Sequence, residues 1–393
     1  MKNVVVLGAG YGSISFLKKL HPKVFDFAKV TLISKYDYHY ISILLHEVVG
    51  GINNETTFLI RDIIPNQVCF VNDEVVEITQ DKIICKNEHY AYDYLVVGLG
   101  FQSDDFGIQG VKEFSFPIED FKNASLLNQK IVSQIDRYKQ TKDESDLRFI
   151  VCGGGFSGIE TIGALLVGLK QICLQKSVDF NLVEIVCIEA MLDILPMFPN
   201  ELVNKAKIFL KDCGVKLATG CKILRCENRR VVVQESEKER IFDGGLIIWT
   251  AGVKGNLVIE KSEFFTSHRS KVEVDSYLQP IAQKNQDLMK NIYIIGDCCM
   301  LKDPDTNRFY PPTGQIAIKQ GEYLGKAFSN RILGLGVEKF TYKSQGTVCS
   351  IGDKYAIGLV GKNKISGFFA MRLKRVIEKK WLFKILGLKG LFK

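Results

Sequence analysis

An α/β fold with two Rossmann-like dinucleotide-binding domains is predicted for this chain of 393 residues, because one sequence pattern occurs in it twice. The pattern is a short apolar run, then a glycine-rich turn, then a segment with helical apolar spacing. It appears as "VVVLGAGYGSISFLKKL" from Val4 and again as "LRFIVCGGGFSGIETIGALL" from Leu147. A basic, amphipathic segment at the C-terminus completes the predicted architecture.

The first glycine-rich turn follows a predicted buried strand at Val4–Leu7. Gly8 permits a tight turn, and Gly10 lets a pyrophosphate approach the backbone at the N-terminus of the next helix. Gly12 follows, and Ser13 occupies the last small position of the motif, where it still allows close packing of helix on strand. This region is therefore predicted to bind a dinucleotide.

The strand after the first helix, "KVTLIS", ends in Ser34 and is followed by Lys35, where an acidic residue is common. The Ser34 hydroxyl can hydrogen-bond a ribose hydroxyl, which predicts a weaker clamp on the nucleotide. The alternative is that Ser34 is an ordinary loop residue.

The second glycine-rich turn contains Gly153, Gly155 and Gly158, with a strand before it and a helix after it. The partner strand "LVEIVCIEA" ends in the acidic residue Glu189. A carboxylate there can bind both ribose hydroxyls and would repel a 2′-phosphate, so NADH is favoured over NADPH.

Two dinucleotide folds in one chain suggest a nicotinamide that reacts with a flavin. The buried strand "YDYLVVGLG" ends in glycines at Gly100 and is expected to return to the first nucleotide domain. The strand "NIYIIGDCC" ends in Gly296 and Asp297, where the carboxylate can accept hydrogen bonds from a ribityl chain while the glycine admits the pyrophosphate.

These motifs resemble those of the two-dinucleotide-binding-domain flavoproteins and, along almost the whole chain, those of the type II NADH:quinone oxidoreductases. The stretches that carry the resemblance are "GAGYGS", "LISKYDYHYISILLHEVVGG", "YDYLVVGLG", "GGGFSGIE", "IEAMLDILPMF", "IIWTAGVKGN" with Gly252, "IYIIGDC" and "PPTGQIAIKQGEYLGKAF". The resemblance implies that the first fingerprint holds non-covalent FAD and the second holds NADH as substrate.

The resemblance also implies roles for individual residues. Glu160 matches a glutamate placed near the nicotinamide and the quinone pocket, although the alternative is a residue favoured by the helix dipole. Gln315 is expected to bond a quinone carbonyl, and Gly314 to pack against the isoalloxazine. Lys319 stands where the family has glutamine; it is expected either to partner a flavin or quinone carbonyl or to extend toward solvent.

The C-terminal segment is strongly basic, with ten Lys or Arg and one acid, Glu378, from residue 362 to 393. Five apolar residues share a face if this segment is helical: Ile377, Trp381, Ile385, Leu388 and Phe392. This distribution favours peripheral contact with an anionic lipid surface over nucleic-acid binding. The alternative is a helix docked on the protein or on a second subunit of a homodimer. No uncharged apolar run reaches 18 residues, so no transmembrane helix is predicted.

We therefore expect an FAD-binding domain at 1–112 and 260–340, an NADH-binding domain at 113–259 and a membrane-anchoring segment at 341–393. The expected activity is hydride transfer from NADH to FAD, then two-electron reduction of a membrane quinone without proton pumping, at the cytoplasmic face of the membrane. No metal is expected, since the eleven cysteines include no CxxC pair. The alternatives are a sulfide:quinone oxidoreductase and a flavin-binding redox sensor without turnover.

Overall fold

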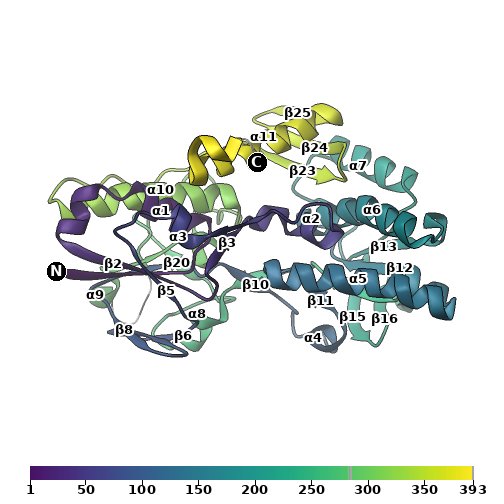
Figure 1. The fold of residues 1–393 in the computed structure, drawn as a ribbon, viewed down its shortest axis with the longest axis horizontal. Helices are drawn as coiled ribbons and strands as arrows, with labels where there is room; N and C mark the ends of the chain where they lie inside the picture. Colours follow the sequence, from purple (N-terminus) through teal and green to yellow (C-terminus); the bar gives the residue numbers. More distant parts are fainter. Residues whose placement is uncertain (282, 284–285, 392–393) are drawn as a thin grey trace. The chain divides into compact units, whose positions relative to one another are not determined.

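The computed structural model describes residues 1–281, 283 and 286–391 and divides into two compact units (Figure 1). The first unit comprises residues 1–40, 57–102 and 254–344. The second comprises residues 41–56, 103–253 and 345–393.

The first unit is built on a parallel five-stranded sheet in the order β21-β9-β1-β2-β5. These strands are β1 (Lys2–Leu7), β2 (Ala28–Ser34), β5 (Cys69–Asn72), β9 (Tyr94–Val97) and β21 (Ile292–Ile294). A three-stranded antiparallel sheet, β6 (Val75–Ile78), β7 (Lys82–Cys85) and β8 (His89–Ala91), lies between β5 and β9 in the chain. The neighbouring strands β1, β9 and β21 are those predicted to carry glycine turns, so these turns meet at one edge of the sheet.

Helices α1 (Tyr11–Lys19) and α10 (Gly314–Ile332) lie side by side in the first unit (Figure 1). Two glycines of α10 allow this approach: a Cβ at Gly321 would overlap the carbonyl oxygen of Gly12, and one at Gly325 would lie 2.6 Å from that of Phe16. The close packing holds the N-terminal end of α10 beside the first glycine turn.

The second unit has a sheet of the same kind in the order β11-β18-β12-β13-β14. Its strands are β11 (Phe116–Pro117), β12 (Arg148–Cys152), β13 (Glu184–Glu189), β14 (Lys216–Thr219) and β18 (Leu246–Trp249). The accompanying helices are α5 (Phe121–Thr141), α6 (Phe156–Lys176) and α7 (Asn200–Asp212), and β15 (Cys221–Glu227), β16 (Arg230–Glu235) and β17 (Lys238–Asp243) form an antiparallel meander. Both Rossmann-like sheets predicted from the sequence are therefore confirmed.

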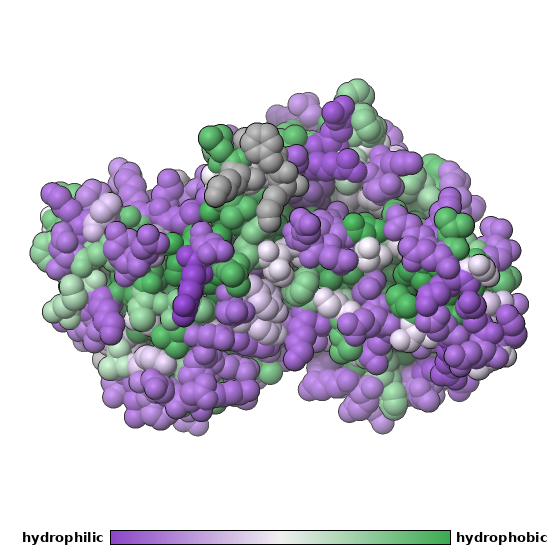
Figure 2. All heavy atoms as spheres, viewed as in Figure 1, coloured by the Kyte–Doolittle hydropathy of each residue, from purple (hydrophilic) through white to green (hydrophobic). Residues whose placement is uncertain are grey.

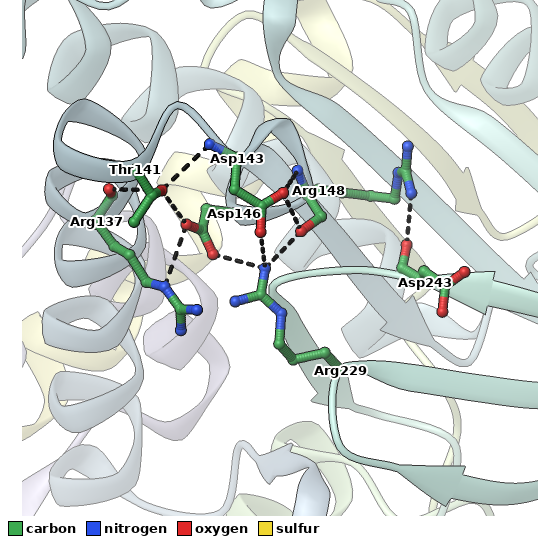
Figure 3. Close-up of polar contacts among 8 residues, drawn as sticks. Arg137, Thr141, Asp143, Asp146, Arg148, Arg229 and Asp243 are labelled. Atoms are coloured by element: carbon green, nitrogen blue, oxygen red, sulfur yellow. Dashed lines mark hydrogen bonds and ion pairs between the residues drawn. The ribbon is translucent and has the colours of Figure 1, made fainter.

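A buried aspartate stabilises the start of this second sheet (Figure 3). Asp146 is fully buried and forms ion pairs with Arg229 (2.6 Å) and Arg137 (3.3 Å), while the hydroxyl of Thr141 donates a hydrogen bond to it. The polar stretch 139–146 contains the end of α5 and a 3₁₀ turn whose aspartate lies in the protein interior.

The compact units differ from the predicted domains most in two segments, and smaller shifts place residues 103–112 in the second unit and residues 254–259 and 341–344 in the first. Residues 41–56, which include α2 (Leu45–Gly50), belong to the second unit because α2 packs on α5 and α6. Residues 345–393 also belong to the second unit, where β23 packs on α6. This segment consists of four elements that pack with one another: β23 (Thr347–Ile351), β24 (Tyr355–Val360), β25 (Asn363–Ser366) and α11 (Phe368–Leu386). Residues 345–393 pack closely on α6 because Gly163 has no side chain: a Cβ at Gly163 would overlap the backbone nitrogen of Gly352.

One described helix, α6, is long and apolar enough to cross a membrane by length and composition alone. However, 67% of its most apolar window is buried within the protein. It follows the second glycine turn and serves as a core helix of the second unit.

Of the five apolar residues predicted to face lipid in the C-terminal segment, two are buried in the protein instead. Trp381 and Ile385 are only 4% and 3% exposed, whereas Ile377 and Leu388 are 42% and 71% exposed. Phe392 lies outside the described residues. Helix α11 ends before Gly387, and a 3₁₀ turn follows at Gly387–Leu391.

Candidate functional site

The first glycine turn of the first unit has an open centre and tightly packed flanks. Gly8 has φ +80°, and a Cβ there would overlap the carbonyl oxygen of Gly98. At Gly10, which caps the N-terminus of α1, a Cβ would meet no described atom within 4 Å. Gly12 faces Ile295 and α10. The backbone N–H groups at Gly10 are therefore accessible to an anion, as the motif predicts.

Ser13, at the last motif position, fits because the residue packed against it, Gly98, has no side chain. Ser13 is fully buried, and its Oγ occupies the space that a Cβ of Gly98 would take. The close packing of helix on strand predicted for this position is therefore preserved, with Gly98 supplying the room.

His39 hydrogen-bonds the backbone of this turn, a role that was not predicted from the sequence. Its Nδ1 lies 2.8 Å from the carbonyl oxygen of Ala9, between the two glycines. Burial lowers the pKa of His39 to about 4, partly offset by that bond, so the ring is neutral and Nδ1 donates. Its sequence signal was weak, a lone histidine in an aromatic stretch.

The turn after β21 contains Gly296 and Asp297. Gly296 donates its backbone N–H to Oε1 of Gln320 at 2.7 Å, and Gln320 is 2% exposed. Burial raises the pKa of Asp297, and the nearby Lys271 opposes that rise. Gln320, on α10, therefore fixes the turn that contains Asp297, although the sequence motif pointed only to its neighbour Lys319.

The N-terminal end of α10 carries the predicted quinone-site residues. The helix begins at Gly314, and Tyr342 donates its hydroxyl to Oε1 of Gln315 at 2.6 Å. Lys319 is 46% exposed and pairs with Glu322 at 3.1 Å. Lys319 is therefore partly exposed and ion-paired on the helix surface, and its role toward a flavin or quinone stays a prediction.

Three further predicted residues of the first unit lie at the ends of its strands. Ser34 is buried at the end of β2, where its carbonyl oxygen accepts hydrogen bonds from Asn72 and Asp73. Lys35 stacks its ammonium over the ring of Tyr36 at 4.7 Å. Gly100, after β9, has φ +76° and open space where a side chain would be.

The glycine turn of the second unit repeats this geometry. Gly153 has φ +113°, a Cβ at Gly155 would meet no described atom within 4 Å, and one at Gly158 would overlap the carbonyl oxygen of Gly153. Oε2 of Glu189 accepts a hydrogen bond from Gly154 N–H at 2.7 Å, and Oε1 accepts one from Met191 N–H. These two hydrogen bonds fix the Glu189 carboxylate beside the glycine turn.

Gly252 follows β18, the sheet neighbour of β12. A Cβ there would overlap the ring of Phe106, and its carbonyl oxygen accepts a hydrogen bond from Asp104 N–H. Gly252 therefore permits a close turn beside the second glycine motif.

Glu160, in the first turns of α6, belongs to a buried cluster that the sequence did not predict. Its Oε1 accepts hydrogen bonds from Nζ of Lys374 at 2.7 Å and from Ser350, through the backbone N–H at 3.1 Å and Oγ at 3.0 Å. Nδ1 of His46, on α2, lies 3.6 Å from Oε2. The side chains of Glu160 and Lys374 are each 6% exposed.

Electrostatics hold the Glu160–Lys374 pair in its charged form. Burial alone would raise the pKa of Glu160, but Lys374 and the other neighbours outweigh burial and lower it. Burial would likewise lower the pKa of Lys374, but Glu160 raises it. Burial lowers the pKa of His46, so the imidazole is neutral beside the pair. The cluster is therefore a buried ion pair with a neutral imidazole beside it.

All eleven cysteines are unpaired, and the part of the chain that the structure describes contains no group of three or more His, Cys, Asp or Glu residues arranged to hold a metal ion. Cys152 and Cys187 are buried in strands.

Comparison with known proteins agrees with this geometry. The family model of pyridine nucleotide-disulphide oxidoreductases matches residues 2–321. The type II NADH:quinone oxidoreductase of Staphylococcus haemolyticus is 36% identical over 400 residues, with 100% of this chain and 98% of the relative covered.

Two solved structures share the fold. The NDH2 protein of Plasmodium falciparum, solved in complex with NADH, aligns with a TM-score of 0.89 at 20% identity, covering 100% of this chain and 96% of that one. The sulfide:quinone oxidoreductase of Aquifex aeolicus aligns with a TM-score of 0.79 at 16% identity, covering 99% and 92%. By its full-length identity to curated relatives, the chain belongs to the type II NADH:quinone oxidoreductase family.

Proposed function

We propose that this protein oxidises NADH and reduces a membrane quinone, using a non-covalently bound FAD and pumping no protons. The observation that carries the proposal is the repeated glycine geometry, in which each unit has an open backbone site at a helix N-terminus. Membership of the family supports the direction of electron flow from NADH to quinone.

FAD fits the first unit. The open N-terminus of α1 at Gly10 suits its pyrophosphate, and Asp297, fixed through Gln320, suits its ribityl chain. When bound, the flavin supplies the acceptor for a hydride and the donor of two electrons. The chain's own groups orient the flavin: His39 fixes the glycine turn, and Gly314, the first residue of α10, is proposed to pack against the isoalloxazine.

NADH fits the second unit. Gly155 leaves its helix N-terminus open, and Glu189 is already fixed by two backbone N–H groups with lone pairs left for ribose hydroxyls. A 2′-phosphate would meet this carboxylate and be repelled, which is why we propose NADH as the substrate.

Quinone reduction needs a proton donor and a hydrogen-bond donor to a carbonyl. Glu160, with Lys374 at 2.7 Å, is proposed to supply the proton. Gln315 is proposed to hold a quinone carbonyl through its amide, whose oxygen is already engaged by Tyr342. Lys319, paired with Glu322, is proposed to affect the site electrostatically only.

The outer face of α11 is proposed to rest on an anionic lipid surface, at the cytoplasmic face of the membrane. Phe369, Val376 and Phe383 are seven residues apart, so they share one side of the helix, and they are 79%, 62% and 46% exposed. Arg372 and Lys380 are exposed on the same helix. Figure 2 shows hydrophobic side chains gathered over the end of α11. Exposed aromatic and basic side chains on one helix are typical of an interfacial helix.

An anaerobic experiment tests the redox proposal. NADH added to the purified flavoprotein should bleach the visible flavin absorbance, and a soluble quinone should restore it. If NADH leaves the flavin oxidised while sulfide reduces it, the chain acts as a sulfide:quinone oxidoreductase. That chemistry needs two reactive cysteines, whereas burial raises the pKa of both Cys152 and Cys349 well above the ordinary value. If neither donor reduces the flavin, the redox-sensor alternative stands.

A second experiment tests the membrane proposal. The variant Phe369→Glu/Phe383→Glu should lose sedimentation with vesicles of phosphatidylglycerol while retaining NADH-driven flavin reduction. Leu174→Glu, at an 83% exposed leucine of α6, is the control and should bind as the unaltered protein does. If light scattering shows a dimer that the double variant dissociates while vesicle binding is unchanged, the face is a homodimer interface.

A further inference from the structure

A cavity of about 220 Å³ lies in the first unit, along the second half of α10. Tyr323, Ala327 and Arg331 line it from this helix, where their spacing of four residues places them on one side. The proposed quinone residues lie at the other end of α10, which begins at Gly314. The cavity therefore has no part in the redox site described above.

The walls of this cavity are largely aromatic. Phe328 is only 1% exposed and packs edge-on against Tyr293 of β21, with ring centroids 6.2 Å apart. Tyr277 and Tyr323 are half-buried, and the hydroxyl of Tyr323 donates a hydrogen bond to the carbonyl oxygen of Glu338 at 2.7 Å. Burial raises the pKa of Tyr293 and of Tyr323, so both phenols are neutral. Such walls suit a further aromatic ring in an edge-on or offset arrangement.

The size of the cavity sets an upper limit on its occupant. An engineered cavity of about 150 Å³ lined by apolar side chains binds benzene. The cavity beside α10 is larger, at about 220 Å³. It therefore has room for one aromatic ring that carries one small substituent.

Arg331 supplies a positive charge to this cavity. Its guanidinium donates hydrogen bonds to three neutral oxygens: the carbonyl of Lys290 at 2.9 Å, the hydroxyl of Tyr293 at 2.8 Å and Oδ1 of Asn291 at 3.1 Å. No carboxylate among the described residues forms an ion pair with Arg331. Its Nε–H and one N–H of Nη2 stay available to a ligand. The group that complements them best is a carboxylate, which the planar guanidinium binds through two hydrogen bonds.

A strained turn holds Tyr277 at the cavity. Leu278 is fully buried and has φ +64°, a backbone conformation that leucine rarely adopts. Oδ1 of Asp275 stabilises this turn by accepting the backbone N–H groups of Tyr277 at 2.8 Å and Gln279 at 3.0 Å. The carbonyl oxygen of Leu278 accepts the N–H of Ile294 in β21 at 3.0 Å. The turn thus fixes Tyr277 in place and engages the Asp275 carboxylate, the negative charge that would oppose an anionic ligand.

We propose that this cavity binds a small planar aromatic carboxylate, with its ring among the tyrosines and Phe328 and its carboxylate on Arg331. The site is separate from both dinucleotide sites, and the inference does not depend on the proposed redox function. A ligand of this size has about nine non-hydrogen atoms, for which a dissociation constant of about 1 mM is expected.

Benzoate is the probe, and the fluorine resonance of 4-fluorobenzoate reports binding to the flavin-loaded protein. Its broadening should saturate with a Kd of about 1 mM, and benzoate should compete. Benzamide keeps the ring without the charge, and cyclohexanecarboxylate keeps the charge without the planar ring. Each should compete about tenfold more weakly than benzoate. NADH and a soluble quinone should not displace the probe.

Three variants of α10 complete the test. Ala327→Leu fills the cavity at an 8% exposed position and should abolish binding without lowering Tm. Arg331→Gln should weaken binding by about tenfold, as expected for loss of a charged hydrogen-bond donor. Lys326→Ala, at an exposed position outside the cavity, is the matched control and should bind as the unaltered protein does. Absence of saturable binding overturns the inference, as does unchanged affinity in both Ala327→Leu and Arg331→Gln. Displacement of the probe by NADH or by the quinone overturns it too, because benzoate then occupies a redox site.

Discussion

Replacing Lys374 by methionine should destabilise the second unit, because it leaves the Glu160 carboxylate buried without its cation. Both side chains are 6% exposed, and removal of one partner from such a pair costs about 3–5 kcal/mol. Glu160 keeps its two hydrogen bonds from Ser350, which places the expected loss at the lower end, about 3 kcal/mol. For a unit of this size that loss corresponds to a fall in Tm of about 6–12 °C.

The loss should depend on pH in a defined direction. In the unaltered protein the pKa of Glu160 is lowered, so the pair stabilises the fold above the unfolded-state pKa and loses this contribution as pH falls. In Lys374→Met, burial acts unopposed by the ammonium and raises the pKa of Glu160, so the neutral acid forms readily as pH falls. The difference in Tm between the two proteins should therefore be large at pH of about 8 and smaller at about 5.

Thermal unfolding followed by circular dichroism at both pH values provides the assay. Lys364→Met is the matched control: Lys364 pairs with Glu201 at 2.9 Å, but the two side chains are 41% and 54% exposed. Such a surface pair contributes at most about 1 kcal/mol. The double variant Glu160→Gln/Lys374→Met should recover much of the lost stability. Equal losses at both pH values, or equal losses in Lys374→Met and Lys364→Met, would refute the reasoning.

Three other predictions concern the nucleotide sites. Gly155→Ala should keep the Tm of the unaltered protein but weaken NADH binding by isothermal titration, whereas Gly158→Ala should lower Tm, since its Cβ overlaps a backbone carbonyl. His39→Ala should weaken flavin retention on dilution by about fivefold, as expected for loss of a hydrogen bond worth about 1 kcal/mol. Because the pKa of His39 is about 4, retention in the unaltered protein should not change across neutral pH. Glu189→Gln should raise the KM for NADH and narrow its advantage over NADPH; an unchanged ratio of the two kcat/KM values would remove Glu189 from the ribose site.

The two nucleotide folds were predictable because their signals are local. Each fingerprint packs a strand, a turn and a helix into about twenty consecutive residues, and backbone sterics at Gly8 and Gly153 dictate the turn whatever the rest of the chain does. Even the departure at Ser13 is compensated by a residue that follows the neighbouring strand, at Gly98. Short-range sterics made this part of the prediction reliable.

The partners of Glu160 were not predictable, because they come from distant parts of the chain. Ser350 is 190 residues away and Lys374 is 214 residues away. Sequence spacing carries no information about such contacts, and composition assigned Lys374 to a basic surface. The compact-unit boundaries differ from the predicted ones for the same reason, since α2 lies in a segment inserted between two parts of the first unit and β23 in the segment that follows it.

The orientation of α11 follows from its one acid. Lys374, Glu378, Trp381 and Ile385 are spaced by four, three and four residues, so they share a helical face. An acid on an otherwise basic helix adds nothing to contact with an anionic lipid surface, whereas on a face that packs against the protein it can balance a buried lysine. The face containing Glu378 was therefore the better candidate for burial. Phe383 lies nine residues, or two and a half turns, from Lys374 and so on the opposite side. One helix thus has an inner face that neutralises Glu160 and an opposite face with the exposed Phe369, Val376 and Phe383, which is the face proposed to contact lipid.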